Sequence, residues 1–232
     1  MPTHPTRVAP PPLATLVVFL KSPSRSKRRL AAAIGAERAA MAASHLLACA
    51  LEDAESWPGP VVLSPAEPCD AEWLERFSAA PRELVVQCGA NLGARINYVD
   101  SELRTRGYEH LLFIGSDCPA LAAPDFVEAA AALARADAVL APARDGGVVL
   151  MGARRPWPAL DDLPWSTAGL RGALEQRLTH CGWHTEALPT FADVDTVEDL
   201  DRAARHIADD PRPARRALYQ WRVSLRAGTG PE

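Results

Sequence analysis

The sequence predicts a single α/β domain built on a mostly parallel sheet. Short apolar runs alternate with helical patterns along most of the chain. The first run, Leu13–Leu20, is continuously apolar, which is typical of a strand buried on both faces. We find no internal repeat and no linker that would divide the 232 residues. Because strands and helices alternate, we expect right-handed crossovers and therefore mainly parallel neighbours in the sheet.

The later elements follow from the same patterns. Further strands are expected at residues 61–63, 84–86, 110–115, 138–140, 148–151 and 185–188. Helices are expected at residues 37–55, 71–79, 92–106, 124–135, 167–181 and 196–208. The segment Asp145-Gly146-Gly147 separates two apolar runs. Its composition favours a tight hairpin turn, which would make one strand antiparallel.

The two ends of the chain are expected to differ from the domain, which we place at residues 13–210. Residues 1–12 are rich in proline and lack a periodic apolar pattern, which predicts a flexible tail. Residues 211–232 carry five arginines among apolar residues. This pattern favours an amphipathic basic helix that packs on the body or on a second subunit of a homodimer. A nucleic-acid arm is disfavoured, because the rest of the chain supplies no basic surface.

Composition is that of an ordinary globular protein with room for a sizeable core. Hydrophobic residues make up 48% and charged residues 23% of the chain. The net charge of -4 gives no bulk attraction to nucleic acid, and the first apolar run is too short to span a membrane. Five scattered cysteines without a C-x-x-C pair argue against a disulfide framework or a zinc site. They fit a cytoplasmic protein, and we expect Cys118 to be a packing residue rather than a nucleophile.

A basic loop follows the first expected strand. Its cations are Lys21, Arg25, Lys27, Arg28 and Arg29. They lie where a strand leads into a helix, and helix N-termini bind anions. Because neighbouring cations repel one another, we expect a di- or triphosphate to bind here; a solvated charge run is the alternative. The glycine patterns of Walker loops and dinucleotide-binding loops are absent.

Carboxylates follow two of the apolar runs. Asp117 comes directly after the run that ends near residue 115, and Asp193 and Asp195 follow a short run late in the chain. Open α/β sheets bind ligands at the carboxyl ends of their strands. Mg²⁺ is typically held by one or two carboxylates plus substrate phosphates. We therefore predict a site for Mg²⁺ (or Mn²⁺) at Asp117 with Asp193 or Asp195. The alternatives are that Asp117 caps the next helix, and that Asp195 or Thr196 caps the last one.

Three polar turns could also contact a ligand. Asp145 could accept hydrogen bonds from sugar or acceptor hydroxyls, and Gly146 and Gly147 would let the backbone approach closely; an ordinary hairpin turn is the alternative. Asn91 opens an expected helix that carries Arg95 on its first turn.

The third turn is Pro164-Trp-Ser-Thr167, in which Ser166 or Thr167 could cap a helix. Trp165 could stack on a base or sugar, or anchor the loop, and we favour the anchor.

Six motifs occur in order along the chain: Lys-x-Pro-x-x-x-Lys-x-Arg-Leu (residues 21–30), Asn-Leu-Gly-x-Arg (91–95), Gly-Ser-Asp-Cys-Pro (115–119), Asp-Gly-Gly (145–147), Pro-Trp-Ser-Thr (164–167) and Asp-Val-Asp-Thr-x-x-Asp-Leu (193–200). Together they resemble a bacterial family usually labelled glycosyltransferase-A-like or nucleotide-diphospho-sugar transferase. The resemblance runs from about Leu13 to Arg205. It implies a GT-A-like three-layer α/β fold with a nucleotide site and a metal site.

The chain is also similar, more distantly, to the phospholactate guanylyltransferases and the molybdenum-cofactor nucleotidyltransferases. These families bind NTP phosphates on the loop after the first strand, which implies that role for Lys21, Lys27 and Arg29. Their metal-binding aspartates correspond to Asp117 and to Asp193 or Asp195.

This chain departs from the first family in two places. Two tyrosines usually follow its Asp-Gly-Gly, where this chain has Val148 and Val149. That change implies an altered acceptor pocket. The usual Lys-Thr-Arg is Lys-Arg-Arg here (residues 27–29), which should keep phosphate binding.

We expect a Mg²⁺-dependent transferase that acts on a nucleotide donor, with Lys27, Asp117 and Asp145 as catalytic residues. The many cations favour nucleotidyl transfer from an NTP to a phosphorylated small molecule. The family label favours glycosyl transfer from a nucleotide-diphospho-sugar. A catalytically silent nucleotide-binding scaffold is the third hypothesis. The expected nucleotide contacts are Lys21, Lys27, Arg29, Asn91, Arg95, Gly146 and Gly147.

Overall fold

Seven strands form one sheet in the computed structural model, which describes residues 13–77 and 83–228. The predicted tail 1–12 lies outside the described residues. The strands are β1 (Thr15–Leu20), β2 (Val61–Pro65), β3 (Glu83–Leu84), β4 (Leu111–Ile114), β5 (Ala138–Pro142), β6 (Val148–Ala153) and β7 (Thr185–Ala187). Their order is β3-β2-β1-β4-β6-β5-β7. All neighbours pair in parallel except β6, which is antiparallel to both β4 and β5. The predicted α/β class and its one antiparallel strand are confirmed.

The helices fall close to the predicted segments, with one addition. They are α1 (Arg28–Ile34), α2 (Ala36–Ser56), α3 (Pro68–Phe77), α4 (Leu92–Thr105), α5 (Ala123–Ala132), α6 (Leu170–His180), α7 (Val197–His206) and α8 (Pro213–Arg226), with a 3-10 turn, η1 (Pro23–Arg25). Helix α1 begins inside the segment that we expected to be a basic loop. It ends at Gly35, whose φ of 89° is in the region that favours glycine.

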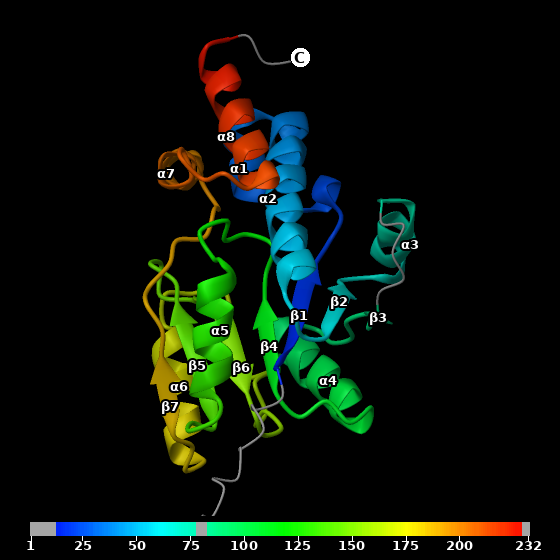
Figure 1. The fold of residues 1–232 in the computed structure, drawn as a ribbon, viewed down its shortest axis with the longest axis vertical. Coiled ribbons are helices and arrows are strands. Elements are labelled where there is room, and N and C mark those ends of the chain that lie inside the picture. Colours follow the sequence, from blue (N-terminus) through cyan, green and yellow to red (C-terminus); the bar gives the residue numbers. More distant parts are fainter. Residues whose placement is uncertain (1–12, 78–82, 229–232) are drawn as a thin grey trace, which may run out of the picture.

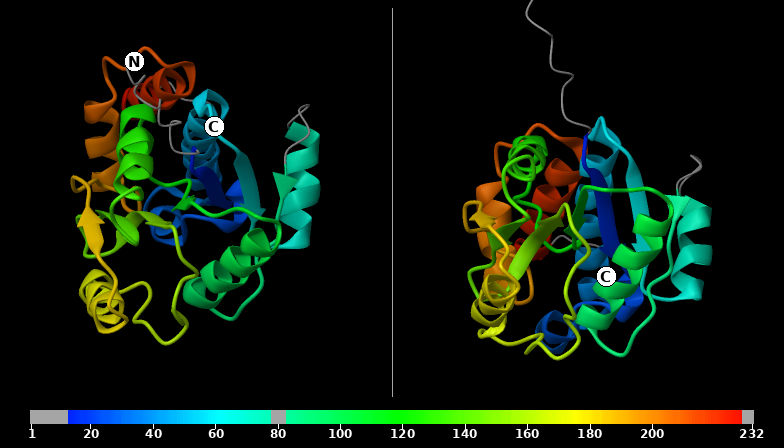
Figure 2. Two further views of the ribbon diagram at one scale, coloured as in Figure 1. Left: turned by 60° about the horizontal axis from the view of Figure 1, so that its bottom comes forward. Right: turned by 90° about the horizontal axis from the view of Figure 1, so that it is seen from below.

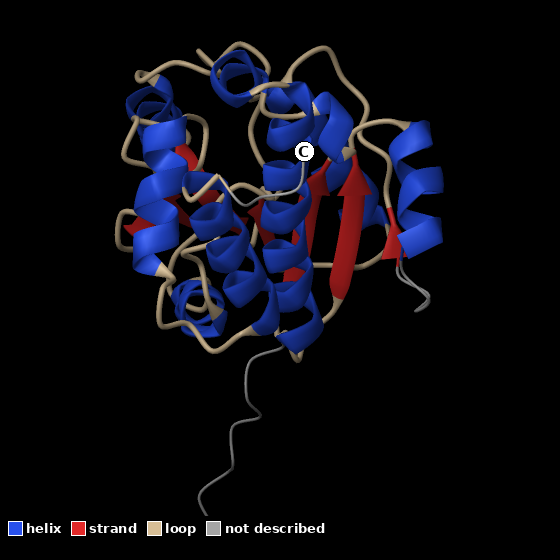
Figure 3. Ribbon diagram, turned by 90° about the horizontal axis from the view of Figure 1, so that it is seen from above, coloured by secondary structure: helices blue, strands red, loops and turns tan. Residues whose placement is uncertain are grey.

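Side-chain alternation along the central strands builds a core on each face of the sheet. Leu16 and Val18 of β1 share a cluster with residues of α2 and α5, whereas Val17 shares one with residues of α4 and α6. The sheet therefore lies between two helical layers (Figures 1, 2 and 3). Because β1 is covered on both sides, it is apolar at almost every position.

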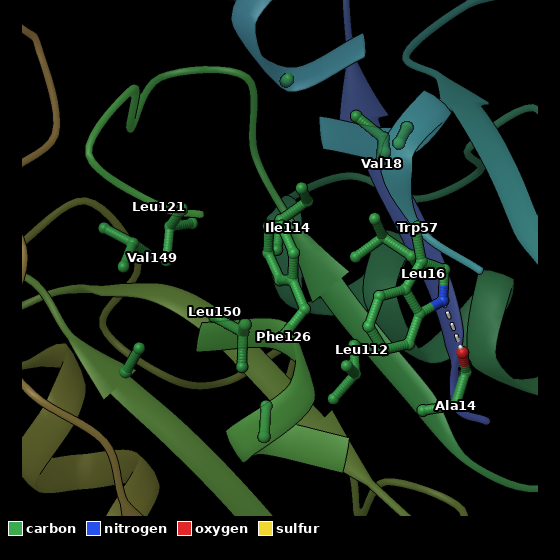
Figure 4. Packing of buried hydrophobic residues seen from close by; sticks show 14 of the residues in the cluster. Ala14, Leu16, Val18, Trp57, Leu112, Ile114, Leu121, Phe126, Val149 and Leu150 are labelled. Carbon is green, nitrogen blue, oxygen red and sulfur yellow. Dashed lines mark hydrogen bonds between the residues drawn. The ribbon is translucent and has the colours of Figure 1, made fainter. Parts of the chain in front are cut away.

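The end of α2 closes the core between the sheet and α5. Trp57 lies edge-on to Phe126, with ring centroids 6.2 Å apart, and its indole Nε1 donates to the carbonyl of Ala14 at 2.9 Å (Figure 4). The buried indole therefore keeps a hydrogen-bond partner while its rings fill the core.

Helix α8 packs on α2 and α7 of the same chain, one of the two arrangements that we expected for the basic segment (Figure 1). Its Arg215 is fully buried. The guanidinium pairs with Asp53 at 2.5 Å and Glu52 at 2.9 Å, and it donates to the carbonyls of Pro119 and Leu121. We call Arg215, Glu52 and Asp53 the Arg215 cluster. It ties α8 to α2 and to the loop that follows Asp117.

None of the helices in the described part of the chain is long and apolar enough to cross a membrane. The five cysteines are unpaired. No disulfide therefore contributes to the stability of the fold within the described residues.

Candidate active site

A cavity of about 580 Å³ opens beside the carboxyl ends of β1 and β4. This volume is within the range of roughly 300–1,000 Å³ that is usual for small-molecule sites. Its position is the one expected for ligands of an open α/β sheet. Eight of the residues that we predicted for the site line the cavity: Lys21, Lys27, Arg29, Asp117, Asp145, Gly147, Asp193 and Asp195.

Lys27 is the buried cation of this cavity. Its Nζ lies 2.8 Å from Oδ2 of Asp117 and 3.2 Å from Oδ1 of Asp195, and it also donates to the carbonyl of Val194. Burial by itself lowers the pKa of Lys27, but the two carboxylates outweigh it and the net pKa is raised. Lys27 is therefore charged and joins the two aspartates. Its predicted contact with phosphate stays a prediction.

The late acidic segment reaches the site by following the end of β5. Phe191 donates its amide to the carbonyl of Pro142 at 2.9 Å. Three residues further on, the amide of Val194 donates to the carbonyl of Asp117 at 2.9 Å. These backbone bonds hold the two acidic segments side by side, although they are far apart in the sequence.

Of the capping alternatives, the one for Thr196 is confirmed, whereas neither Asp117 nor Asp195 caps a helix. Thr196 is the N-cap of α7: its hydroxyl accepts from the amide of Asp199, whose carboxylate accepts from the amide of Thr196. The first turn of α5 is closed by Asp125. Asp117 and Asp195 are therefore not needed at a helix end and face Lys27 instead.

Asp193 and Asp145 add further negative charge to the cavity. Burial raises the pKa of Asp193 to about 6, and the charges of Asp145 and Asp195 contribute to the shift. Asp145 also accepts from the amide of Gly147 at 2.9 Å. The hairpin turn that we expected is present, and its aspartate lines the cavity at the same time.

The fit of a divalent cation depends on two of these carboxylates. Among residues 13–77 and 83–228, no three His, Cys, Asp or Glu side chains form a group that could hold a metal ion. Asp117 and Asp195 nevertheless converge on one point, the ammonium of Lys27. Mg²⁺ needs only one or two carboxylates when substrate phosphates supply further oxygens. The donor set therefore fits Mg²⁺ or Mn²⁺ bound together with a nucleotide.

The basic segment divides into two parts. Arg25 does not line the cavity; it pairs with Glu67 and Asp70 at 2.6 Å each. Lys21, Arg28 and Arg29 do line it and are exposed. Four of the five expected cations therefore line the cavity. The fifth, Arg25, is bound to α3 and to the residue before it.

Three predicted ligand contacts lie outside the lining. Asn91 caps α4 by accepting from the amide of Ala94, and Arg95 donates to the carbonyl of Gly89. Gly146 has a φ of 92°, and a Cβ there would lie 2.2 Å from the carbonyl oxygen of Ala168. All three residues therefore stabilise the local backbone. Their contact with a nucleotide stays a prediction.

Trp165 and Cys118 behave as the favoured interpretations expected. The indole of Trp165 donates to the carbonyl of Leu160 at 2.6 Å, which anchors its loop, although the ring also lines the cavity. Burial raises the pKa of Cys118 to about 12, so its thiol is not ionised near neutral pH.

Sequence reasoning missed the apolar part of the cavity. Phe19, Phe113 and Met151 line it, whereas we had assigned their strands only to the core. Their positions in the sequence could have indicated this. Each lies within a few residues of the point where a strand meets a loop that carries the polar residues of the cavity.

The protein has an α/β fold with a mostly parallel sheet, and solved structures described as nucleotide-diphospho-sugar transferases and nucleotidyltransferases share that fold. The chain also matches, over residues 30–167, the family described as "Uncharacterized protein conserved in bacteria (DUF2064)". It belongs to that family. No curated protein matches the chain.

Solved structures share the fold at low sequence identity. A candidate nucleotide-diphospho-sugar transferase from Desulfovibrio desulfuricans is 24% identical, with a TM-score of 0.83 over 95% of this chain and 100% of the other. A nucleotidyl transferase from Methanothermobacter is 13% identical, with a TM-score of 0.57 over 85% and 98%. A CMP:2-keto-3-deoxy-manno-octonic acid synthetase in complex with CTP is 14% identical, with a TM-score of 0.53 over 85% and 99%.

Proposed function

We propose that the protein is a metal-dependent transferase that acts on a nucleotide donor, and that nucleotidyl transfer is its reaction. The observation that carries this proposal is the convergence of Asp117 and Asp195 in a cavity that is also lined by exposed cations. Carboxylates that bind a metal and cations that bind phosphate are the two components that a nucleotide phosphate chain requires. The named neighbours of the fold support the same class.

In this reaction the donor is an NTP and the acceptor carries a phosphate. An acceptor phosphate oxygen attacks the α-phosphorus, the bond from that phosphorus to the β-phosphate oxygen breaks, and pyrophosphate leaves. Lys21, Arg28 and Arg29 bind the phosphate chain electrostatically, while Lys27 holds Asp117 and Asp195 together. When bound, Mg²⁺ would neutralise the charge that develops on the phosphates.

Glycosyl transfer is the second candidate. The Desulfovibrio structure, with a TM-score of 0.83, is described as a candidate nucleotide-diphospho-sugar transferase. In such a reaction the acceptor hydroxyl would attack the anomeric carbon and the nucleoside diphosphate would leave. Asp145, exposed at the hairpin turn, would then accept a hydrogen bond from the acceptor.

The two candidates are separated by thermal-shift and calorimetric titration of the full chain. NTPs are compared with UDP-, GDP- and ADP-sugars, each with and without Mg²⁺. Nucleotidyl transfer predicts tighter binding of an NTP and release of pyrophosphate, whereas glycosyl transfer predicts tighter binding of a sugar nucleotide. Metal-dependent binding without turnover of any candidate acceptor would favour a silent scaffold, and no binding at all would contradict the proposal.

A further inference from the structure

The cavity has an apolar wall in addition to its charged side. We define the wall by six lining residues from β1, α4, β4, β6 and α6: Phe19, Ile96, Phe113, Val148, Met151 and Leu170. All six belong to, or pack against, the core cluster between the sheet and α4 and α6. The cavity therefore continues from the charged strand ends onto one apolar face of the sheet.

The floor of this wall is continuous across three strands. Phe113 of β4 is paired in register with Met151 of β6. On its other side, the ring of Phe19 of β1 meets Phe113 edge-on, with centroids 5.7 Å apart. Phe113 and Met151 are each only 4% exposed, so the surface that the cavity leaves accessible belongs mainly to the partly exposed Phe19 and Val148. Accessible apolar surface inside a cavity is stabilised when an apolar ligand covers it.

Two polar side chains beside the wall already have partners within the protein. The indole of Trp165 donates to Leu160, and the hydroxyl of Thr167 donates to the carbonyl of Pro164 at 2.8 Å. The six wall residues carry no polar side chain that could replace the hydrogen bonds that water gives the polar edge of a nucleobase. A hydrocarbon or aromatic body would lose none.

We propose that the apolar wall binds the acceptor, and that the acceptor is amphiphilic. Its phosphate head would lie on the charged side of the cavity, and its hydrocarbon or aromatic body would cover Phe19 and Val148 beside the edges of Phe113 and Met151. This inference rests on the proposed function and names the acceptor class for the same cavity.

The test uses n-alkyl phosphates as probes, because they vary the apolar body and keep the head constant. Butyl, hexyl and octyl phosphate are titrated calorimetrically into the full chain below their micelle concentrations, with Mg²⁺ and a saturating NTP present. Burial of each added methylene group should tighten binding about two- to fourfold. Glucose 1-phosphate, which has the same head and a polar body, should bind more weakly than octyl phosphate.

Two variants locate the binding on the wall. Val148→Thr adds a hydroxyl to it, and Leu92→Gln changes a neighbouring lining residue that is half exposed, so neither change should prevent folding. Each should weaken octyl phosphate at least five times more than it weakens the NTP. Val127→Gln is the matched control, because Val127 is exposed on α5 and does not line the cavity.

The experiment tests the apolar wall and the nucleotide site separately. Affinity independent of chain length, or chain-length dependence that Val148→Thr and Leu92→Gln leave unchanged, would overturn the inference. A larger loss of NTP affinity than of octyl phosphate affinity would also overturn it, because the wall would then hold the nucleobase. NTP binding without alkyl phosphate is measured first, and its absence would reject the proposed function itself.

Discussion

Two buried cations in this protein are each held by two carboxylates, and their surroundings differ. At Lys27 the cation is 2% exposed, while Asp117 and Asp195 are 44% and 41% exposed. In the Arg215 cluster the cation is 0% exposed, and its partners Asp53 and Glu52 are 2% and 20% exposed.

The difference indicates which ion pairs can change partners. The carboxylates around Lys27 remain accessible from the cavity side, so a metal ion or a phosphate can reach the group without unfolding the protein. The Arg215 cluster is closed, and burial raises the pKa of Asp53 to about 6 even beside two arginines. A cation paired with two carboxylates is thus accessible to ligands at Lys27, whereas in the Arg215 cluster it stabilises the packing of α8 on α2.

We expect the largest effect on stability from a substitution in the Arg215 cluster. Arg215→Met removes the guanidinium and leaves the buried carboxylate of Asp53 with fewer partners. We expect the free energy of unfolding to fall by about 3–5 kcal/mol, measured by urea denaturation at pH 7. The exposed Arg216 is the control, and Arg216→Met should change stability by less than about 0.5 kcal/mol. If Arg215→Met lowered the free energy of unfolding by less than about 1 kcal/mol, the proposed difference between the Arg215 cluster and the Lys27 site would be wrong.

Lys27→Met should cost much less stability than Arg215→Met, although both cations are buried. Asp117 and Asp195 can be solvated from the cavity, so the change leaves no fully buried charge without a partner. We expect a loss of about 1 kcal/mol, together with weaker NTP binding, measured by the same denaturation and by calorimetry. Equal losses for the two variants would show that the cavity carboxylates are not accessible in solution.

Asp193→Asn should stabilise the protein at pH 7. The pKa of Asp193 is raised from 3.8 to about 6 in the folded state, so its favourable contribution is complete below pH 3.8 and is lost as pH rises through 6. Asparagine removes the penalty of the charged form, and because Asp193 is only partly buried we expect a gain of about 0.5–1 kcal/mol. The gain should shrink as pH falls from 7 to 4. A loss of stability at pH 7 would contradict the raised pKa of Asp193, which is caused first by burial and then by the charges of Asp145 and Asp195.

Arg29→Ala and Arg25→Ala should have opposite effects on stability and binding. Arg29 is 69% exposed, and its nearest contact to Asp195 is 3.5 Å, so stability should change by less than about 0.5 kcal/mol. NTP affinity should fall several-fold more than nucleoside affinity. Arg25→Ala should lower stability more, because it leaves the buried Asp70 without its arginine, and should leave NTP affinity unchanged. If Arg25→Ala weakened NTP binding and Arg29→Ala did not, the phosphate contact would not be at Arg29.

The sheet and most helices could be predicted from the sequence, because their signals are local. The continuous apolar run that became β1 and the Asp-Gly-Gly turn before β6 depend only on burial and turn chemistry. The start of α1 was missed because its first residues are arginines, which carry no apolar periodicity. The end of the chain was ambiguous, since an amphipathic helix can pack on its own domain or on another.

The site was predictable in its charged part and not in its geometry. The position of Asp117 just after the end of β4 follows from topology. That Asp195, rather than Asp193, meets Lys27 depends on the backbone bonds of Phe191 and Val194, which no residue pattern encodes. The partners of Arg25 and Arg215 are equally non-local, because they are chosen by tertiary packing.

The most direct test of the account is a double-mutant cycle on Mn²⁺ binding, followed by electron paramagnetic resonance in the presence of a saturating NTP. If Asp117 and Asp195 bind one ion together, Asp117→Asn and Asp195→Asn should each weaken Mn²⁺ at least tenfold. The double variant should be only slightly weaker than either single one, because the two changes remove the same site. Unchanged Mn²⁺ affinity in both single variants would contradict a shared metal site at these two aspartates.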